Sequence, residues 1–303
     1  MSATQQAHYP IALLALDLDG TVVRESMAVD PVVMDLLSKL ISQQVVRVVV
    51  ATGRMHPSAK LYADRLGIVE PVISYQGGMI CAQDAAQTQL LHQPIPFSVA
   101  RRLLAFLDAE GFHTNTYVNN VLYTHATNPF LDLYRTLSGL EPTLIEDWSQ
   151  IPQHSPIHSS PTQAIPVQGP TKLMVINEER MPVLMAGLKE HFNTEVTYFL
   201  SRSNFCEIIA PTVSKWSAVW WLAQQWGLSP NVIMACGDQE NDAAMIEQAG
   251  VGVAMGNAPA HIKALANRIA PHVDAEGLVP LLRELLETGG VTASTVRGEG
   301  VAE

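Results

Sequence analysis

The sequence predicts an α/β protein: a doubly wound parallel sheet with a second, α+β domain inserted into it. Short apolar runs alternate with amphipathic helical stretches at both ends of the chain, a pattern typical of βαβ units and a parallel sheet. Hairpin patterns occupy the middle of the chain. Acidic and polar residues directly follow three of the apolar runs, where open α/β sheets bind their ligands.

The apolar runs are short and bounded by turn residues, as expected for strands buried on both faces. These runs are Ile11–Leu16, Val45–Val50, Pro71–Ser74, Val232–Ala235 and Val251–Met255. Helices are predicted from amphipathic spacing, from proline or a capping residue at the start, and from glycine after the end. The predicted helices are Pro31–Gln44, Ser58–Leu66, Ser214–Trp226, Asp242–Ala249 and Gly277–Leu286.

The middle of the chain carries two hairpin patterns. Thr114–His125 has Asn119-Asn120 at its centre, a typical hairpin turn, and a second pattern turns near Ser201–Asn204. A helix at Asn128–Leu137 and a strand at Lys172–Ile176 are expected between them. The sequence therefore predicts an inserted α+β domain at residues 85–205, within a core formed by residues 1–84 and 206–303.

Two further stretches are predicted to lack regular structure. The loop Ser149–Pro170 contains five prolines, which exclude a helix or a central strand. Its two histidines, His154 and His158, are more readily explained as loop residues than as metal ligands. Residues from about 288 to 303 are expected to form a flexible tail.

The composition excludes several classes of protein. A net charge of −11 without a cluster of Lys and Arg argues against nucleic-acid binding. The three cysteines (Cys81, Cys206 and Cys236) have no C-x-x-C spacing, which argues against a zinc site or disulfides and fits a reducing cytosol. No apolar stretch reaches the ~18 residues of a membrane span, and the first eight residues lack a basic residue. We expect a soluble cytoplasmic protein without a signal peptide.

Three predicted strands end in residues that suit a phosphate ester and a cation. The residues that follow them are Asp17, Asp19, Gly20 and Thr21, then Thr52, Gly53 and Arg54, and finally Gly237, Asp238, Asn241 and Asp242. Carboxylates gathered at one edge of a sheet need a cation, and oxygen ligands favour Mg²⁺. Residues two apart on a strand point to the same side, so the carboxylates of Asp17 and Asp19 could both face one site.

These residue types also suggest a reaction. A carboxylate can attack phosphorus as a nucleophile, and a second carboxylate can act as general acid and base. Lys215 would bind the phosphoryl charge, although a lysine in the first turn of a helix could equally be an ordinary surface residue. A turn or a helix cap could explain each acidic segment separately, but their arrival at one edge favours a common site.

Four segments resemble the four motifs of the haloacid dehalogenase-like (HAD) superfamily. They are D-L-D-G-T at 17–21, A-T-G-R at 51–54, S-K at 214–215 and G-D-Q-E-N-D at 237–242. The segments G-V-A-M-G-N-A at 252–258 and E-G-L at 276–278 are further similar to the Cof-type, sugar-phosphatase-like subfamily. This resemblance covers nearly the whole chain and implies a HAD-like Rossmannoid core in which the inserted domain is a cap.

The resemblance implies a Mg²⁺-dependent phosphatase that hydrolyses a small phosphorylated metabolite. Asp17 would form an aspartyl phosphate, and Asp19 would protonate the leaving alcohol and then activate water. The implied metal ligands are Asp17, the carbonyl of Asp19, and Asp238. The implied phosphate-binding residues are Leu18, Thr52, Gly53, Arg54, Lys215 and Asn241, supported by Thr21 and Asp242.

The chain departs from the family pattern in two places. Relatives commonly carry N-G-G or N-G-A after the third strand, whereas this chain has Gln76-Gly77-Gly78. The Pro-rich loop at 149–170 is also unusual, and it lies in the expected cap. The residues therefore do not name the substrate, which could be a sugar phosphate, a nucleotide, flavin mononucleotide or pyridoxal phosphate.

Three alternatives remain open at this stage. A phosphomutase would use the same aspartates but pass the phosphoryl group to a sugar. A phospho-receiver module also places acidic residues, a Thr and a Lys around Mg²⁺, but such modules are single domains whose acceptor Asp lies on a later strand. A binding module that has lost catalysis is disfavoured because each motif retains its chemical group. The Trp-rich segment Val219–Trp226 fits a core helix better than an interface, and the oligomeric state cannot be inferred.

Overall fold

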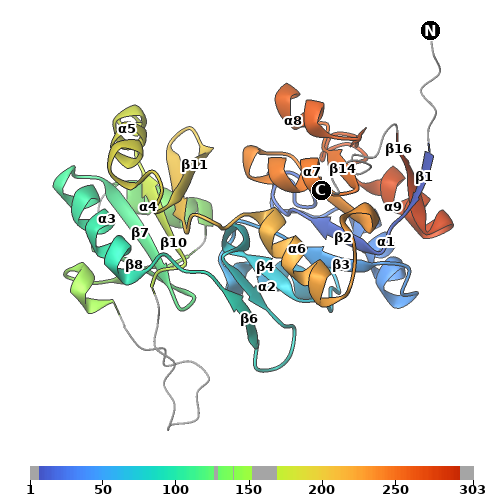
Figure 1. The fold of residues 1–303 in the computed structure, drawn as a ribbon, viewed down its shortest axis with the longest axis horizontal. Helices are drawn as coiled ribbons and strands as arrows, with labels where there is room; N and C mark the ends of the chain where they lie inside the picture. Colours follow the sequence, from blue (N-terminus) through green and yellow to red (C-terminus); the bar gives the residue numbers. More distant parts are fainter. Residues whose placement is uncertain (1–6, 126–128, 139, 152–168, 294–303) are drawn as a thin grey trace, which may run out of the picture. The chain divides into compact units, whose positions relative to one another are not determined.

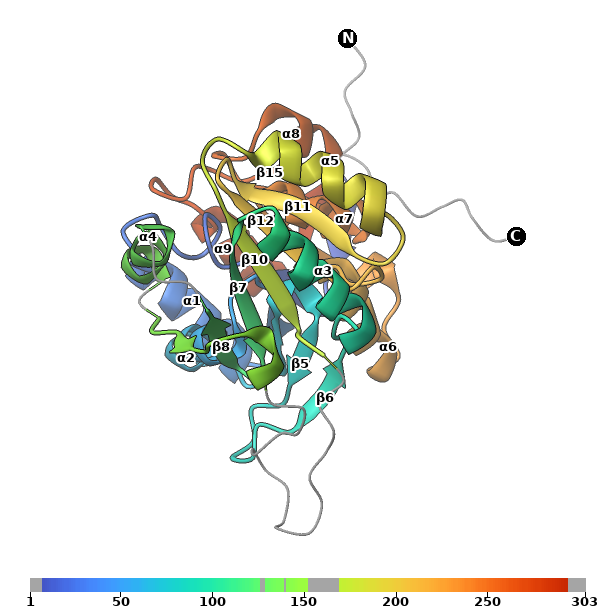
Figure 2. The same cartoon turned by 90° about the vertical axis from the view of Figure 1, so that its left-hand side faces the viewer.

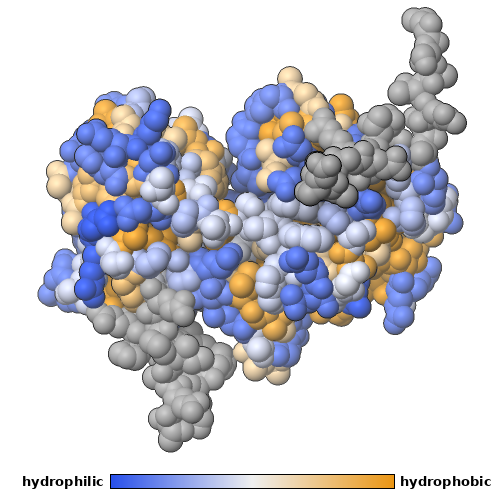
Figure 3. Space-filling view, viewed as in Figure 1, coloured by the Kyte–Doolittle hydropathy of each residue, from blue (hydrophilic) through white to orange (hydrophobic). Residues whose placement is uncertain are grey.

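The computed structural model describes residues 7–125, 129–138, 140–151 and 169–293. The chain divides into two compact units, one formed by residues 1–90 and 214–303 and the other by residues 91–213 (Figure 1). His154 and His158 lie outside the described residues. Among the described helices, none has the length and apolar character needed to cross a membrane, and hydrophilic and hydrophobic residues intermix on the face drawn in Figure 3.

The first unit is built on a five-stranded parallel sheet, which confirms the predicted fold class. Its strands are β2 (Leu13–Leu16), β3 (Arg47–Val50), β13 (Ile233–Gly237), β14 (Val251–Ala254) and β15 (Arg268–Ile269). They pair in the order β15-β14-β13-β2-β3. The chain runs outward from β2 to β3 on one side and from β13 to β15 on the other. Strand order therefore reverses between β2 and β13, which is where such sheets bind ligands.

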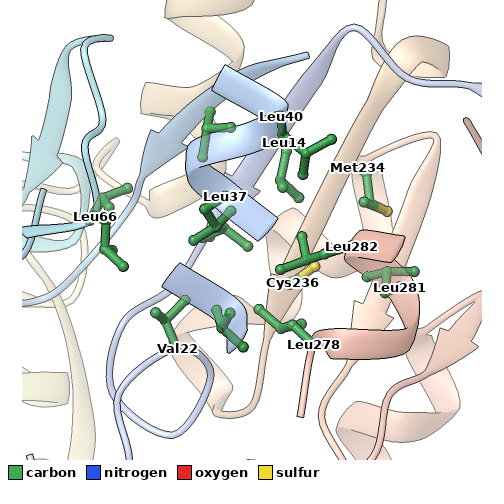
Figure 4. Packing of buried hydrophobic residues seen from close by; sticks show 14 of the residues in the cluster. Leu14, Val22, Leu37, Leu40, Leu66, Met234, Cys236, Leu278, Leu281 and Leu282 are labelled. Carbon is green, nitrogen blue, oxygen red and sulfur yellow. The ribbon is translucent and has the colours of Figure 1, made fainter. Parts of the chain in front are cut away.

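Alternating side chains of this sheet form a core with helices on one face. The helices are α1 (Pro31–Ser42), α2 (His56–Arg65) and α9 (Val279–Thr288). Leu14, Met234 and Cys236 of the strands pack with Leu37 and Leu40 of α1 and with Leu281 and Leu282 of α9 (Figure 4). Cys236 is a buried free thiol, and burial raises its pKa.

The other face of the sheet is covered by α6 (Lys215–Gln225) and α7 (Ala243–Gln248), and α8 (Ala260–Leu265) packs beside α7. The approach of α7 to β14 is close: a Cβ on Gly252 would lie 1.8 Å from the Ile246 carbonyl oxygen. Residue 252 must therefore be glycine for these elements to pack as they do.

A small antiparallel sheet continues from the parallel one. It contains β4 (Val72–Ser74), β5 (Met79–Cys81) and β6 (Gln89–His92). The predicted strand Pro71–Ser74 forms, but a single bridge between Ala51 and Ile73 joins it to the parallel sheet. Residues 75–78 form the turn between β4 and β5.

The second unit contains a six-stranded sheet in the order β11-β12-β10-β7-β8-β9. The strands are β7 (His113–Val118), β8 (Val121–Thr124), β9 (Thr143–Leu144), β10 (Lys172–Ile176), β11 (Thr197–Arg202) and β12 (Phe205–Ile209). Helices α3 (Phe97–Ala109) and α5 (Met181–Phe192) share one hydrophobic core with it, and they lie across the same side of the strands in Figure 2. Helix α4 (Pro129–Ser138) contributes Tyr134, whose hydroxyl bonds that of Tyr117.

Both predicted hairpins are confirmed. Strands β7 and β8 pair through a two-residue turn in which Asn119 and Asn120 have φ angles of 51° and 60°. Asparagine tolerates this left-handed geometry, which a tight hairpin turn requires. Strands β11 and β12 also pair antiparallel.

The structure corrects the predicted boundaries in three places. A boundary at 205/206 would cut β12, which pairs with both β10 and β11 of the second unit. A boundary at 84/85 would detach β6 from the sheet it shares with β5. The tail predicted from about residue 288 is wrong for its first residues, because β16 (Gly290–Ala293) pairs with β1 (Ala7–Pro10). The rest of that tail lies outside the described residues.

Candidate active site

The predicted site residues gather at the carboxyl ends of β2, β3 and β13, on either side of the strand-order reversal. Asp17 directly follows β2, and its N–H donates to the Cys236 carbonyl of β13 at 3.0 Å. Thr52 follows β3, and its N–H donates to the Ile73 carbonyl at 3.1 Å. Asp238 directly follows β13. Parallel strand ends therefore carry the three motif segments to one edge.

Lys215 lies between two of the carboxylates. Its Nζ donates to Asp17 Oδ1 at 2.5 Å and to Asp242 Oδ1 at 2.6 Å, and only 1% of its surface is exposed. A capping box positions it: Ser214 Oγ accepts from the Ser217 N–H, and Ser217 Oγ accepts from the Ser214 N–H, both at 3.0 Å. The start of α6 is thereby defined, and Lys215 is its first residue.

Asp242 holds the loop that follows β13. Its Oδ2 accepts from the N–H groups of Asp238 at 2.9 Å and Gln239 at 3.1 Å. A Cβ on Gly237 would lie 2.4 Å from the Asp242 Cβ, so the loop needs glycine there. Asp242 therefore both shapes this loop and anchors Lys215.

Asp238 has one oxygen that is bonded and one that is not. Its Oδ2 accepts from Asn257 Nδ2 at 2.9 Å and Gln239 Nε2 at 3.0 Å. Its Oδ1 is buried and has no hydrogen-bond partner among the described residues. Buried carboxylate oxygens are normally satisfied, so this atom is suited to a cation.

The three buried carboxylates of Asp17, Asp238 and Asp242 can each offer one oxygen within 4.8 Å of the others. Burial and repulsion from Asp242 raise the pKa of Asp17, although Lys215 opposes the shift. The same two causes raise the pKa of Asp238 to about 6. Burial lowers the pKa of Lys215, but attraction to Asp17 and Asp242 outweighs it and leaves this pKa raised. One ammonium group does not balance three carboxylates, and the all-oxygen donor set fits Mg²⁺.

Asp19 is not one of the three clustered carboxylates. Arg54 grips it with two hydrogen bonds, Nε to Oδ2 at 2.8 Å and Nη2 to Oδ1 at 2.5 Å. The Arg54 guanidinium also lies over the Tyr62 ring, 4.5 Å from its centroid. The side chain of Asp19 is 55% exposed, so its carboxylate does not share the buried site of Asp17.

The turn after β2 explains this divergence. The Leu18 carbonyl accepts from the N–H groups of Thr21, Val22 and Val23, and Gly20 has a φ of +81°. The strand has therefore ended before Asp19. The Leu18 side chain is fully buried, which leaves only backbone groups of this residue for the predicted phosphate contact. Thr21 Oγ1 is buried without a partner among the described residues.

The remaining predicted phosphate-binding residues, Asn241, Gly53 and Thr52, all lie next to Gln76. Asn241 Nδ2 donates to Gln76 Oε1 at 3.0 Å. A Cβ on Gly53 would lie 2.2 Å from Gln76 Nε2. Thr52 is buried, and its Oγ1 accepts from the Arg54 N–H at 3.2 Å.

Sequence reasoning gave no role to two amides that the structure places here. Asn257 links three segments, since Nδ2 donates to the Gly20 carbonyl at 2.8 Å as well as to Asp238, and Oδ1 accepts from the Val273 N–H at 3.1 Å. In the sequence, Asn257 belongs to the segment 252–258 that resembles the Cof-type subfamily, and Gln76 stands where the chain departs from the family pattern.

Comparisons with known proteins show the family of this chain. A family model described as haloacid dehalogenase-like hydrolase matches residues 14–282. The pyridoxal phosphate phosphatase YbhA of Escherichia coli is 28% identical over 84% of this chain and 91% of its own. The 5-amino-6-(5-phospho-D-ribitylamino)uracil phosphatase YitU of Bacillus subtilis is 22% identical over 90% of this chain and 96% of its own.

Solved structures share the fold. The crystal structure of TM0651 from Thermotoga maritima is 26% identical to this chain, with a TM-score of 0.77 over 90% of this chain and 97% of that one. The family model, the curated relatives and the shared fold together confirm the resemblance carried by the four motifs. The chain therefore belongs to the haloacid dehalogenase-like hydrolases and is a phosphatase of that family.

Proposed function

We propose that this phosphatase is Mg²⁺-dependent and hydrolyses a small phosphorylated metabolite through an aspartyl phosphate on Asp17. The proposal rests on the buried cluster in which Lys215 bridges Asp17 and Asp242, beside an Asp238 Oδ1 that has no hydrogen-bond partner in the described part of the chain. Such a cluster is costly in an ordinary protein interior, and it suits a site that receives a cation and a phosphoryl group.

In the first step, Asp17 is the nucleophile. Lys215 holds Oδ1, and Oδ2 attacks phosphorus while the bond from phosphorus to the ester oxygen breaks. In its protonated form, Asp19 gives its proton to the departing alkoxide, which leaves as the alcohol. Asp17 then carries the phosphoryl group as an acyl phosphate.

In the second step, Asp19 is the base. Its carboxylate takes a proton from water as the water oxygen attacks phosphorus, and the bond to Asp17 breaks. Inorganic phosphate leaves, and both aspartates return to their starting states. The exposed position of Asp19 at the edge of the site suits an acid and base that exchanges protons with an alcohol and with water.

The phosphoryl oxygens are bound by donors from three segments. We assign Thr52 Oγ1 and the Gly53 N–H from the end of β3, Lys215 from the start of α6, and Asn241 from the loop after β13. Donors fixed before the reaction stabilise developing charge most effectively. Thr52 and Lys215 are buried, and Asn241 is hydrogen-bonded to Gln76.

Asp17, Asp238 and the carbonyl of Asp19 would hold Mg²⁺. When bound, the ion would supply positive charge to the carboxylate cluster and to the phosphoryl group. Asp238 Oδ1 is buried and has no hydrogen-bond partner among the described residues, and burial and the Asp242 carboxylate raise the pKa of Asp238 to about 6. Both observations support a cation at this position.

The substrate class is proposed from relatives and from the inserted unit. YbhA and YitU are named for two phosphomonoesters with different leaving groups, a pyridine derivative and a ribitylaminouracil. Shared phosphate chemistry with variable leaving groups fits a substrate-selecting cap, and we assign that role to residues 91–213.

Hydrolysis of p-nitrophenyl phosphate tests this function. The Asp17→Asn variant should lose at least about 10³-fold in kcat, because the nucleophile is gone. Excess EDTA should abolish wild-type activity, and added Mg²⁺ should restore it. In ¹⁸O-labelled water, a phosphatase places one labelled oxygen in released phosphate, whereas a mutase places little. Full activity in Asp17→Asn would refute the proposed mechanism.

A further inference from the structure

Gln76 lies in backbone geometry that residues with side chains rarely adopt. Tyr75 and Gln76 have consecutive positive φ angles of 52° and 62° in the turn between β4 and β5. Such residues cluster at functional sites and persist only where the surroundings hold them. The chemistry of hydrolysis described above uses neither residue.

Two of the motif segments hold this turn in place. The Tyr75 N–H donates to the Arg54 carbonyl at 2.9 Å, and the Gln76 N–H donates to the Thr52 carbonyl at 3.0 Å. On its other side, a Cβ on Gly77 would lie 2.1 Å from the Ser214 carbonyl oxygen. The turn is therefore clamped between the end of β3 and the residue that caps α6.

The Gln76 side chain spans the site from this turn. It is 2% exposed, its Nε2 lies where a side chain on Gly53 would stand, and its Oε1 accepts from Asn241 Nδ2 at 3.0 Å. The side chain therefore connects the segment after β3 to the loop after β13, two segments that contribute phosphate-binding residues.

We propose that Gln76 is a positioning residue for phosphate binding and acts through Asn241, an inference that rests on the proposed function. The terminal torsion of an asparagine side chain is broad, and its amide nitrogen carries two protons. The hydrogen bond to Gln76 occupies one proton and orients the second for a phosphoryl oxygen. The shorter side chain of asparagine at position 76 would fall about 1.5 Å short, one C–C bond length.

A double-mutant cycle tests this role. Gln76→Met keeps the size of the side chain and removes the amide, and Asn241→Ala removes the group it orients. Gln76→Met should lower kcat/KM for p-nitrophenyl phosphate about 10- to 100-fold, as misplacement of a binding group does. It should also weaken competitive inhibition by inorganic phosphate. In the Asn241→Ala background the same change should cost less than about 3-fold, because coupled residues are not additive.

Gln44→Met is the matched control. Gln44 is an exposed glutamine with a φ of 54°, outside the site. Its replacement should therefore leave kcat/KM and the inhibition constant for inorganic phosphate unchanged. Thermal unfolding of each variant shows whether a loss of kcat/KM comes from misfolding or from a misplaced Asn241 side chain. Gln76→Asn should lower kcat/KM as Gln76→Met does, because the asparagine side chain is too short to bring its amide to Asn241.

A readout independent of turnover is the pair of side-chain amide NMR signals of Asn241, identified by their loss in Asn241→Ala. Gln76→Met should shift them, and Gln44→Met should not. Two results would overturn the role of Gln76 in an active wild-type enzyme. One is an unchanged pair of Asn241 signals in Gln76→Met. The other is a double variant whose loss in kcat/KM equals the product of the losses in Gln76→Met and Asn241→Ala. A wild type without phosphatase activity would instead refute the proposed function, and the NMR signals would still report the contact.

Discussion

Arg54 and Asp19 form a two-bonded ion pair at the edge of the site, with Nε–Oδ2 and Nη2–Oδ1 distances of 2.8 and 2.5 Å. The planar guanidinium fixes the carboxylate in direction as well as in distance. Arg54 is itself fixed, since it lies over Tyr62 and its Nη1 donates to Ser58 Oγ at 3.2 Å. Arg54 therefore fixes the position of Asp19, the proposed acid and base, and Tyr62 and Ser58 fix the position of Arg54.

Arg54→Lys should lower kcat about 10-fold, a fraction of the 10²–10⁴ that a positioned acid or base supplies, because lysine cannot make the paired contact. Steady-state kinetics on p-nitrophenyl phosphate measures the effect. Arg47→Lys is the control, since Arg47 also pairs with a carboxylate (Glu70) and lies over a ring (Trp226) at the opposite end of β3. Equal kcat values for the two variants would contradict a positioning role for Arg54.

Lys215→Met should both inactivate and destabilise the protein. Removing the ammonium leaves Asp17 and Asp242 buried without a counter-charge, a change that costs about 3–5 kcal/mol. Urea unfolding with a chelator present measures the loss. Adding Asp242→Asn to Lys215→Met should recover part of the stability but none of the activity. A double variant no more stable than Lys215→Met would show that repulsion between these carboxylates is not the cause.

The stability of the metal-free protein should depend on pH through Asp238. Burial raises its folded pKa to about 6, above the ordinary value of 3.8 for an aspartate, so the folded state binds the extra proton between these values. This contribution to stability is therefore lost as pH rises from about 4 to 6. The wild type should lose stability relative to Asp238→Asn across that window, measured by urea unfolding in a chelator. A constant difference between the two proteins would contradict the raised pKa.

Gly20→Ala should impair metal binding more than its backbone strain explains. The added Cβ would lie 2.3 Å from Asp238 Oδ2, and the φ of Gly20 is +81°. Gly67→Ala is the matched control, because Gly67 has a φ of +69° and no atom of the described residues lies within 4 Å of the added Cβ. Both variants should lose roughly 1–2 kcal/mol to left-handed backbone. Only Gly20→Ala should need more Mg²⁺ for half-maximal activity, and an equal requirement would refute the contact.

Local patterns predicted most of the fold. Strands buried on both faces appear as continuous apolar runs, and Asn119-Asn120 supplies the left-handed turn of a hairpin without help from the rest of the chain. The pairing of β1 with β16 was missed because it joins opposite ends of the chain. The assignment of β12 to the second unit was missed because an apolar strand does not indicate which sheet it will join.

Residue types at strand ends predicted where the site lies, since parallel strands bring their carboxyl ends to one edge. The roles of Gln76 and Asn257 could not be predicted in the same way. Both are amides in turns, and each matters through partners distant in sequence: Gln76 through Asn241, and Asn257 through Gly20 and Asp238. An isolated amide in a turn is as easily explained by solvent exposure.

By itself, the sequence determined which chemical groups this phosphatase presents and at which edge of the sheet they stand. Only the tertiary structure decided which cationic side chain pairs with each carboxylate. Spacing of two residues would place Asp17 and Asp19 on one side of a continuous strand. The strand ends before Asp19, in the turn that contains Gly20. Lys215 therefore donates to Asp17 and Asp242, whereas Arg54 donates to Asp19. Alternation along a strand is local, but the choice of partner depends on which helix starts pack against its end.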